Sequence, residues 1–397
     1  MFSLNKKLDS NLKNYMEFNT SRSYRVLIKC RNFQDSIEKR ILSYKGTILR
    51  NINIDNIICA ILNSQSINRL LEYPEVEYIC LDQFFNLCGI SVQTANRVRL
   101  SNSINASGRG VGIGVIDSGV YPHRDLTTPF NRIATFTDLI NGLSFPYDDN
   151  GHGTCTCGVI AGNGESSNGI YKGIAPNSEL HVIKAFNRLG KGYVSDVLYA
   201  INELISISHK YNIKILCLPF ESLNHDKFIF SLFDKILKKA VDLGITPILP
   251  SGSNSIEGSI MGIALSKNAI TVSGLDTTSK TTPYEYSSTG APKKDFKPNF
   301  CAACVDIVSL NCNTSYISEK NNTKIYAPKL SSSYKSFSGT SISAAYISGI
   351  CALLYELTPT LSFDDIVSML TASSTNLDLP LNTQGEGCIN LNKLFKK

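Results

Sequence analysis

The chain has 397 residues, of which 43% are hydrophobic and 18% charged, and these values are ordinary for a folded globular protein. The formal net charge of +6 comes without a lysine or arginine block, so no nucleic-acid-binding surface is predicted. No apolar run of about eighteen residues occurs, and we therefore expect no membrane span. The polar start lacks the apolar core of a signal peptide. Together with twelve cysteines, this predicts reduced thiols and a cytoplasmic location.

The first ninety residues carry the pattern of a small α+β domain. Residues 1–22 are polar and are expected to form a flexible leader. Over residues 23–90, alternation and helical periodicity predict the order strand, helix, strand, strand, helix, strand. This is the split βαβ arrangement of ferredoxin-like domains. The expected segments are Tyr24–Lys29, Ile37–Ser43, Gly46–Arg50, Asn56–Leu62, Ser66–Glu72 and Val76–Leu81.

Residues 91–397 are expected to form a larger α/β domain. After an approach rich in Ser and Asn, an apolar run begins at Val111 and ends in Asp117. Such a run is typical of a buried strand in a parallel sheet, and similar runs occur at residues 180–186 and 213–218. Functional groups gather at the carboxyl ends of strands in open α/β sheets, so Asp117 is a candidate site residue.

Two further motifs contain residues that complement a carboxylate. His152 lies between glycines in Asn150–Thr154, which leaves its imidazole accessible. Ser341 lies in a Gly-Thr-Ser turn that leads into an apolar helix, whose N-terminus supplies backbone N–H groups. A serine at a helix start is usually only a cap, but with a histidine base and an orienting carboxylate it becomes a nucleophile.

The order Asp117, His152, Ser341 is one of the known chain orders of the catalytic triad. With their surrounding motifs, these residues resemble the subtilisin-like serine protease family (peptidase S8, subtilases), and the resemblance covers nearly all of residues 24–392. It implies a three-layer α/β domain around a mostly parallel sheet. It also implies an endopeptidase that needs no cofactor for its chemistry: Asp117 orients His152, His152 acts as base and then acid, and Ser341 attacks the scissile carbonyl.

The resemblance also assigns a role to the small N-terminal domain. Residues 23–90 are expected to be an inhibitory propeptide that assists folding and lays its C-terminal tail through the active-site cleft. Self-cleavage is then expected between about Asp82 and Ser91. An ordinary N-terminal domain that stays attached is the alternative. The implied partners are protein or peptide substrates and the propeptide itself, with neither nucleic acid nor membrane.

Two segments are expected, by the same resemblance, to bind substrate backbone as an added β-strand. The positions that carry over are Gly190, Gly192, Leu218, Pro219 and Phe220. Where the family has Ser-Leu-Gly, this chain has Pro219, Phe220 and Glu221. Pro219 lacks an N–H, and the two residues after it can narrow the pocket for the residue before the cut or make it negative. The substrate preference therefore stays open.

The segment expected to form the oxyanion hole also departs from the family. The family places an Asn directly after the glycine that corresponds to Gly252; here Ser253 stands there and Asn254 follows. A side-chain donor to the oxyanion contributes ~3–4 kcal/mol. Either Asn254 reaches the hole through a shifted loop, or Ser253 donates less well, or the hole is impaired. An impaired pseudoprotease that regulates another protein by binding it is therefore the alternative function.

Metal binding is left open by the sequence. The loop at residues 163–168 and the pair Asp148–Asp149 offer oxygen ligands for a structural Ca²⁺, although exposed acidic loops are more often solvated. Cys301 and Cys304 have CxxC spacing without a second pair, so buried thiols are expected rather than a zinc site.

Overall fold

The computed structural model describes residues 7–18, 21–31, 33–87, 106–222, 226–291 and 297–395, with the backbone alone for residues 84–87. The chain divides into two compact units. The first comprises Met1–Phe84 and Tyr193–Glu203, and the second comprises Phe85–Gly192 and Leu204–Lys397.

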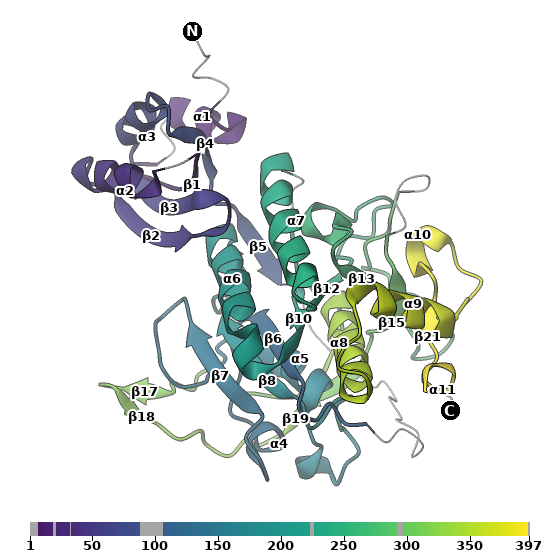
Figure 1. Ribbon diagram of the computed structural model, residues 1–397. Coiled ribbons are helices and arrows are strands. Elements are labelled where there is room, and N and C mark those ends of the chain that lie inside the picture. The colour runs from purple at the N-terminus through teal and green to yellow at the C-terminus, as the bar shows by residue number, and fades with distance from the viewer. Residues whose placement is uncertain are drawn as a thin grey trace. The chain divides into compact units, whose positions relative to one another are not determined.

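The first unit is built on an antiparallel sheet of four strands in the order β2-β3-β1-β4 (Figure 1). Strand β1 pairs with both β3 and β4, and branched apolar side chains from the sheet and its helices form one core. This is the split βαβ order, so the fold predicted for the region is confirmed. The elements are β1 Tyr24–Cys30, α2 Gln34–Ser43, β2 Thr47–Ile52, η2 Ile54–Asn56, β3 Ile57–Leu62, α3 Ser64–Leu71 and β4 Val76–Leu81.

A helix, α1 (Ser10–Glu17), occupies part of the segment for which the sequence predicts a flexible leader. Asp9 caps it by accepting a hydrogen bond from the backbone N of Leu12 at 2.9 Å. Leu12 is fully buried in the core of the unit, and Leu8 forms a backbone bridge with Ile79. A cap and one buried apolar side chain order this short helix because the core it packs against already exists.

The first half of helix α6 (Val194–Tyr211) also belongs to the first unit. Asp82 Oδ1 accepts from the backbone N of Ser195 at 2.9 Å and so caps this helix. Arg25 donates to Asp82 at 2.6 Å and to Asp196 at 2.9 Å. Both carboxylates are almost completely buried and therefore need a compensating charge. Arg25 supplies it to both, and Arg50 also pairs with Asp196, with its Nε 3.5 Å from Oδ1.

The second unit contains a ten-stranded, mostly parallel sheet in the order β20-β21-β15-β13-β12-β10-β6-β8-β7, with β14 beside β13. Strand β6 is buried along its whole length. The strands after it extend the sheet on both of its sides, through β8 and β7 on one and β10 and β12 on the other, so its carboxyl end is a topological switch point. The strands are β6 Gly112–Asp117, β7 Ile133–Asp138, β8 Glu179–Lys184, β10 Ile213–Cys217, β12 Thr246–Pro250, β13 Ile270–Asp276, β14 Thr282–Pro283, β15 Phe300–Ala303, β20 Ser374–Thr375 and β21 Cys388–Ile389.

Helices of the second unit pack on this sheet (Figure 1). Helix α8 (Thr340–Leu357) crosses β10, β12, β13 and β15 and packs against α5 (His152–Ala161), while α7 (Lys227–Asp242) packs on β12. Among the described helices, only α8 has the length and hydropathy to cross a membrane, and 83% of that stretch is buried within the protein, as in a core helix. The shorter helices are α4 Arg124–Thr127, η3 Glu165–Ser167, η4 Gly262–Leu265, α9 Phe363–Ser373, α10 Leu381–Gln384 and α11 Leu391–Leu394.

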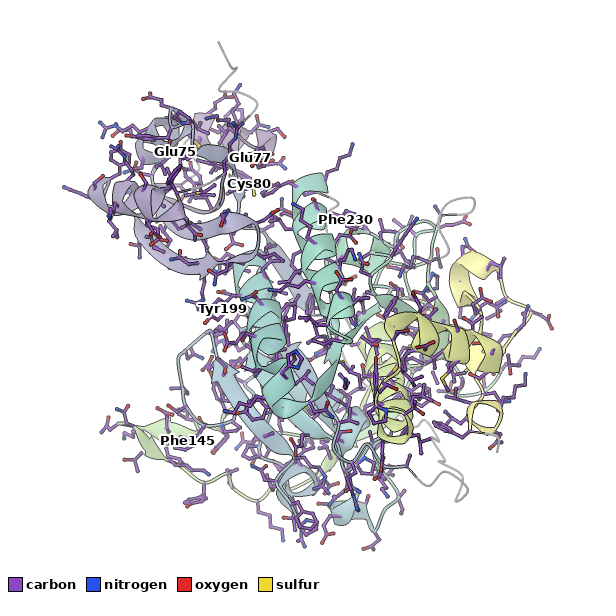
Figure 2. All side chains as sticks on the ribbon, viewed as in Figure 1. Glu75, Glu77, Cys80, Phe145, Tyr199 and Phe230 are labelled. Carbon is purple, nitrogen blue, oxygen red and sulfur yellow. The ribbon has the colours of Figure 1, made fainter. Side chains whose placement is uncertain are left out.

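Three small sheets complete the described structure. Strand β5 (Phe84–Leu87) lies between β11 (Phe220–Ser222) and β9 (Lys191–Tyr193), and β16 (Ile307–Leu310) pairs with β19 (Tyr334–Phe337). The polar stretch at residues 311–330 contains a hairpin, β17 (Glu319–Lys320) and β18 (Thr323–Lys324). Phe145 lies beside this hairpin (Figure 2), with the Lys324 ammonium 5.4 Å from the centre of its ring.

Candidate active site

Asp117 and His152, far apart in sequence, meet at the carboxyl end of β6. Asp117 is the last residue of that strand and is fully buried. His152 is the first residue of α5. Its Nδ1 lies 2.8 Å from Asp117 Oδ1 and 2.9 Å from Oδ2. A carboxylate on Nδ1 makes that nitrogen the protonated one and directs Nε2 elsewhere.

Glycine at position 153 permits this close approach of α5 to β6. A Cβ at Gly153 would lie 2.0 Å from the carbonyl oxygen of Gly119 and 3.1 Å from Asp117 Cβ. The backbone N of Gly153 donates to Ser118 Oγ at 3.0 Å. The first turn of α5 is thereby held directly against the end of β6, which places His152 over Asp117.

Asp148 is a buried carboxylate that organises the turn before His152. Its Oδ1 accepts from Ser118 Oγ at 2.9 Å and from the backbone N of Asn150 and Gly151 at 3.1 and 2.8 Å. Its Oδ2 accepts from the backbone N of Thr154 at 2.8 Å and from the Thr154 hydroxyl at 2.6 Å. Five donors from two segments of the chain, Ser118 and residues 150–154, therefore converge on one side chain, and this joins the neighbour of Asp117 to the start of α5.

Ser341 is the second residue of α8, and the helix is preceded by Gly339, whose φ of 150° favours glycine. Its Oγ donates to the carbonyl oxygen of Pro219 at 3.0 Å. The neighbouring Thr340 Oγ1 donates to the carbonyl oxygen of Gly252 at 3.1 Å. The start of α8 is thus tied to the segments that follow β10 and β12, and α8 itself packs against the helix that begins with His152.

The segments expected to bind substrate backbone do bind an extended chain in this structure. The backbone of residues 85–87 pairs antiparallel with β11, with Phe220 opposite Leu87 and Glu221 opposite Asn86. Strand β9, on the other side of β5, contains Gly192, and the preceding turn contains Gly190 at a φ of 71°. These two edges therefore accept a third strand between them.

The residues between β10 and β11 have divided roles. The backbone N of Leu218 donates to the carbonyl oxygen of Ile248 on the neighbouring strand at 2.9 Å. The backbone N of Phe220 donates to the carbonyl oxygen of Leu218 at 2.9 Å, which closes a tight turn with Pro219 at its centre. The Phe220 side chain is fully buried, with its ring centre 5.2 Å from that of Phe186. Of the two side chains expected to narrow the pocket, Phe220 thus packs into the core.

Glu221, by contrast, reaches across to the segment after β12. Its Oε2 accepts from the backbone N of Ser253 at 2.7 Å, and the Ser253 side chain also hydrogen-bonds the carboxylate. A Cβ at Gly252 would lie only 2.6 Å from Oε2. Burial raises the pKa of the Glu221 carboxyl, and the hydrogen bonds from Ser253 offset part of that rise.

Asn254 lies at a polar hollow beside this contact. Its Oδ1 accepts from the backbone N of Ile256 at 3.1 Å, and its own backbone N donates to Ser288 Oγ at 3.0 Å. The residues that line the hollow are Glu221, Ser222, Ser251, Asn254, Ser259 and Met261. Both oxyanion candidates therefore lie on one short loop, and each has a polar side-chain atom hydrogen-bonded within the chain.

Near the site, two cysteines are buried and two aspartates are hydrogen-bonded or ion-paired within the protein. Burial raises the pKa of the Cys155 and Cys157 thiols far above the usual value, which makes them unreactive. Among the described residues, no group of three or more His, Cys, Asp or Glu is placed to hold a metal ion. Asp148 already accepts five hydrogen bonds, and Asp149 pairs with the buried ammonium of Lys184 at 2.6 Å. These two carboxylates are therefore engaged by the chain.

Two of these contributors were missed as site residues by sequence reasoning. The sequence indicates Asp148 only as a possible cation ligand, and it does not indicate Lys184 as a site residue. The Lys184 ammonium, fully buried, donates to the carbonyl oxygens of Ser118 and Phe186 as well as to Asp149. A lysine at the end of an apolar strand was the available signal, because a buried charge must find partners.

Comparisons with known proteins identify relatives of this chain. A model of the subtilase family matches residues 108–387. The chain is similar to the serine protease AprX of Bacillus subtilis (strain 168), at 30% identity over 303 residues that make up 73% of this chain and 67% of that protein. It is 26% identical to subtilisin DY of Bacillus licheniformis over 307 residues, 76% of this chain and 96% of the relative. Fervidolysin from Fervidobacterium pennivorans has a similar fold, with a TM-score of 0.70 and 16% identity; the match covers 94% of this chain but only 61% of fervidolysin.

Proposed function

The chain belongs to the subtilase family of serine endopeptidases, and from that premise we propose that it hydrolyses extended polypeptides through an acyl-enzyme on Ser341. The observation that carries the assignment is the pairing of Asp117 with His152, in which both oxygens of a buried carboxylate lie within 2.9 Å of Nδ1. Such a carboxylate holds the imidazole in the tautomer whose Nε2 can accept a proton, and it stabilises the imidazolium that forms.

In the proposed mechanism, His152 removes the proton of the Ser341 hydroxyl as Oγ attacks the scissile carbonyl. Backbone N–H groups and the positive end of the dipole at the start of α8 stabilise the resulting oxyanion. His152 then gives the proton to the leaving amine, and water releases the acyl group by the same steps. We assign the larger share of oxyanion binding to the α8 backbone, because Ser253 is engaged by Glu221.

We also propose that residues 23–90 act as the intramolecular inhibitor. Support comes from the backbone of residues 85–87, which lies on β11 as a substrate strand would. The expected window for self-cleavage, Asp82 to Ser91, begins within the described residues, but its part from residue 88 onward lies outside them. A cut there would free a strand that now fills the edge between β9 and β11.

Two further expectations are kept as proposals. The substrates are proteins or peptides in extended form, because main-chain pairing along β11 recognises backbone rather than sequence. A reducing, cytoplasmic compartment is supported by the cysteines, since every one of the eleven that the structure describes is a free thiol.

A pseudoprotease is the second candidate function, and a specific contact favours it. Glu221 accepts hydrogen bonds from both the backbone N and the side chain of Ser253. Ser253, which stands at the family's oxyanion position, therefore donates to a carboxylate of the chain itself. An oxyanion donor contributes ~3–4 kcal/mol, so its loss slows turnover by about 10²–10³-fold. The chain would then act mainly by binding other proteins.

Intact-mass measurement of the purified wild type beside Ser341→Ala separates these functions. We expect the wild type to lose its N-terminal segment at one bond and Ser341→Ala to stay at full length. Ser348→Ala is the matched control, because this serine lies on the same helix and its hydroxyl donates to the carbonyl oxygen of Ala344, one turn earlier. If the wild type also keeps its full length over a range of pH, the pseudoprotease becomes the better assignment.

A further inference from the structure

We propose that the Glu221 side chain, with its hydrogen bonds to Ser253 (the Glu221 bridge), restricts the residue before the cut to a small, uncharged side chain. The inference rests on the proposed function and deepens it by naming the class of substrate. It concerns a position at which this chain departs from the Ser-Leu-Gly pattern that its sequence otherwise resembles.

The segments that supply most of the lining of the hollow are hydrogen-bonded to the start of α8, which carries the proposed nucleophile. Ser341 Oγ contacts the carbonyl oxygen of Pro219 at 3.0 Å, and Thr340 Oγ1 contacts that of Gly252 at 3.1 Å. The two segments that these carbonyls belong to, residues 219–222 and 251–254, supply most of the lining of the hollow. A side chain that enters between them therefore belongs to a residue at the reacting bond.

The direction of substrate binding follows from the pairing on β11. The backbone of residues 85–87 shows that this edge takes an antiparallel strand, with Glu221 opposite Asn86. On β11 the Phe220 side chain is buried in the core, while Glu221 and Ser222 line the hollow, and Glu221 has the longer side chain of these two. Glu221 is thus the large side chain of β11 that meets an incoming substrate residue.

The Glu221 bridge joins the two sides of this space. Its Oε2 is 2.7 Å from the backbone N of Ser253 and would be 2.6 Å from a Cβ on Gly252, so the carboxylate is packed against the opposite backbone. A large substrate side chain has to displace it and leave the Ser253 N–H without its acceptor, which carries the cost of an unpaired polar group. A small side chain does not.

A preference for lysine or arginine is the competing expectation, because Glu221 is acidic. The backbone N of Ser253 already donates to Oε2, and no second carboxylate lines the hollow among the described residues. A substrate cation would therefore have to compete with a charge-assisted hydrogen bond to the chain itself. Size, rather than charge, is the property that the bridge selects.

Hydrolysis of three peptides that differ only in the residue before the cut, Ala, Phe or Lys, tests this. We expect the wild type to prefer Ala over Phe in kcat/KM, and Glu221→Gly to shift that ratio toward Phe by about 10–200-fold, the range for a change in pocket size. Glu221→Gln keeps the size and an acceptor for Ser253, so it should keep the wild-type ratio. Glu257→Gln changes an exposed glutamate outside the hollow and is the control. Glu221→Ala replaces the glycine variant if the latter unfolds at a lower temperature than the wild type.

The outcomes separate this inference from the proposed function. A wild type that prefers Lys, with the preference lost in Glu221→Gln, overturns the size argument in favour of charge. Equal Ala-to-Phe ratios in wild type and Glu221→Gly overturn it as well, while self-processing and labelling by a serine-directed fluorophosphonate show that the enzyme is active. If the wild type neither processes itself nor reacts with that probe, the proposed function fails and the inference fails with it.

Discussion

Replacement of Asp148 by asparagine should be among the most damaging single-atom changes near the site. The carboxylate accepts five hydrogen bonds, three on Oδ1 and two on Oδ2, and the side chain is fully buried. In Asp148→Asn one oxygen becomes an NH₂ group that faces donors, so at least two donors lose their acceptor. At about 1–3 kcal/mol for each unsatisfied buried group, the unfolding free energy should fall by about 2–6 kcal/mol.

Urea unfolding followed by circular dichroism checks this value, with Ser341→Ala in both proteins to prevent self-digestion. Asp242→Asn is the matched control, because Asp242 forms an exposed pair with Lys238 and such pairs contribute about 0–1 kcal/mol. In the active background, peptide hydrolysis by folded Asp148→Asn should also fall, since Asp148 holds the turn before His152. A loss of stability below about 1 kcal/mol would refute the view that these five contacts act as one buried network.

Three further predictions use other contacts. Gly153→Ala places a Cβ 2.0 Å from the Gly119 carbonyl oxygen, so kcat/KM should fall about 10²-fold or more, as for a displacement of about 1 Å at a catalytic group; unchanged kinetics would contradict the packing argument. Burial lowers the pKa of Lys297 from 10.5 to about 7, so between these values the unfolded chain binds one proton more and the unfolding free energy rises with pH. In Lys297→Met the unfolding free energy, measured by urea titration from pH 7 to 10, should rise less with pH than in the wild type. An equal rise in both proteins would contradict the lowered pKa of Lys297. Arg25→Ala leaves the buried Asp82 carboxylate without its guanidinium partner, so the unfolding free energy should fall by about 3–5 kcal/mol. Thermal unfolding measures this loss, and a smaller one would show that the carboxylate takes up a proton instead.

The architecture was predictable because it depends on patterns local in sequence. Alternating and continuous apolar runs marked the strands of both units, and the order of the first unit's strands and helices was confirmed by its sheet. The apolar run that ends in Asp117 lies at the switch point of the large sheet, where the position of a carboxylate follows from topology alone. Asp117 and His152 could be paired before the structure because their motifs resemble those of a known family.

The features that the sequence did not predict depend on the direction in which individual side chains point. Leu12 stabilises a helix within residues 1–22, where the sequence predicts a flexible leader, because its side chain is buried in the core of the first unit. On β11, Phe220 turns into the core and Glu221 toward the hollow, and the sequence left both in the pocket because strand register decides which face each residue takes.

The sequence by itself therefore determined the family, the order of the elements and the residues proposed for catalysis, since these depend on local motifs and periodicity. The tertiary structure alone decided which groups surround them. The five donors on Asp148 and the contact of Glu221 with Ser253, 32 residues away, join segments that no local pattern links. Hydrogen bonding and packing between distant segments are settled only when the chain has folded, because each contact requires the positions of all the elements that carry it.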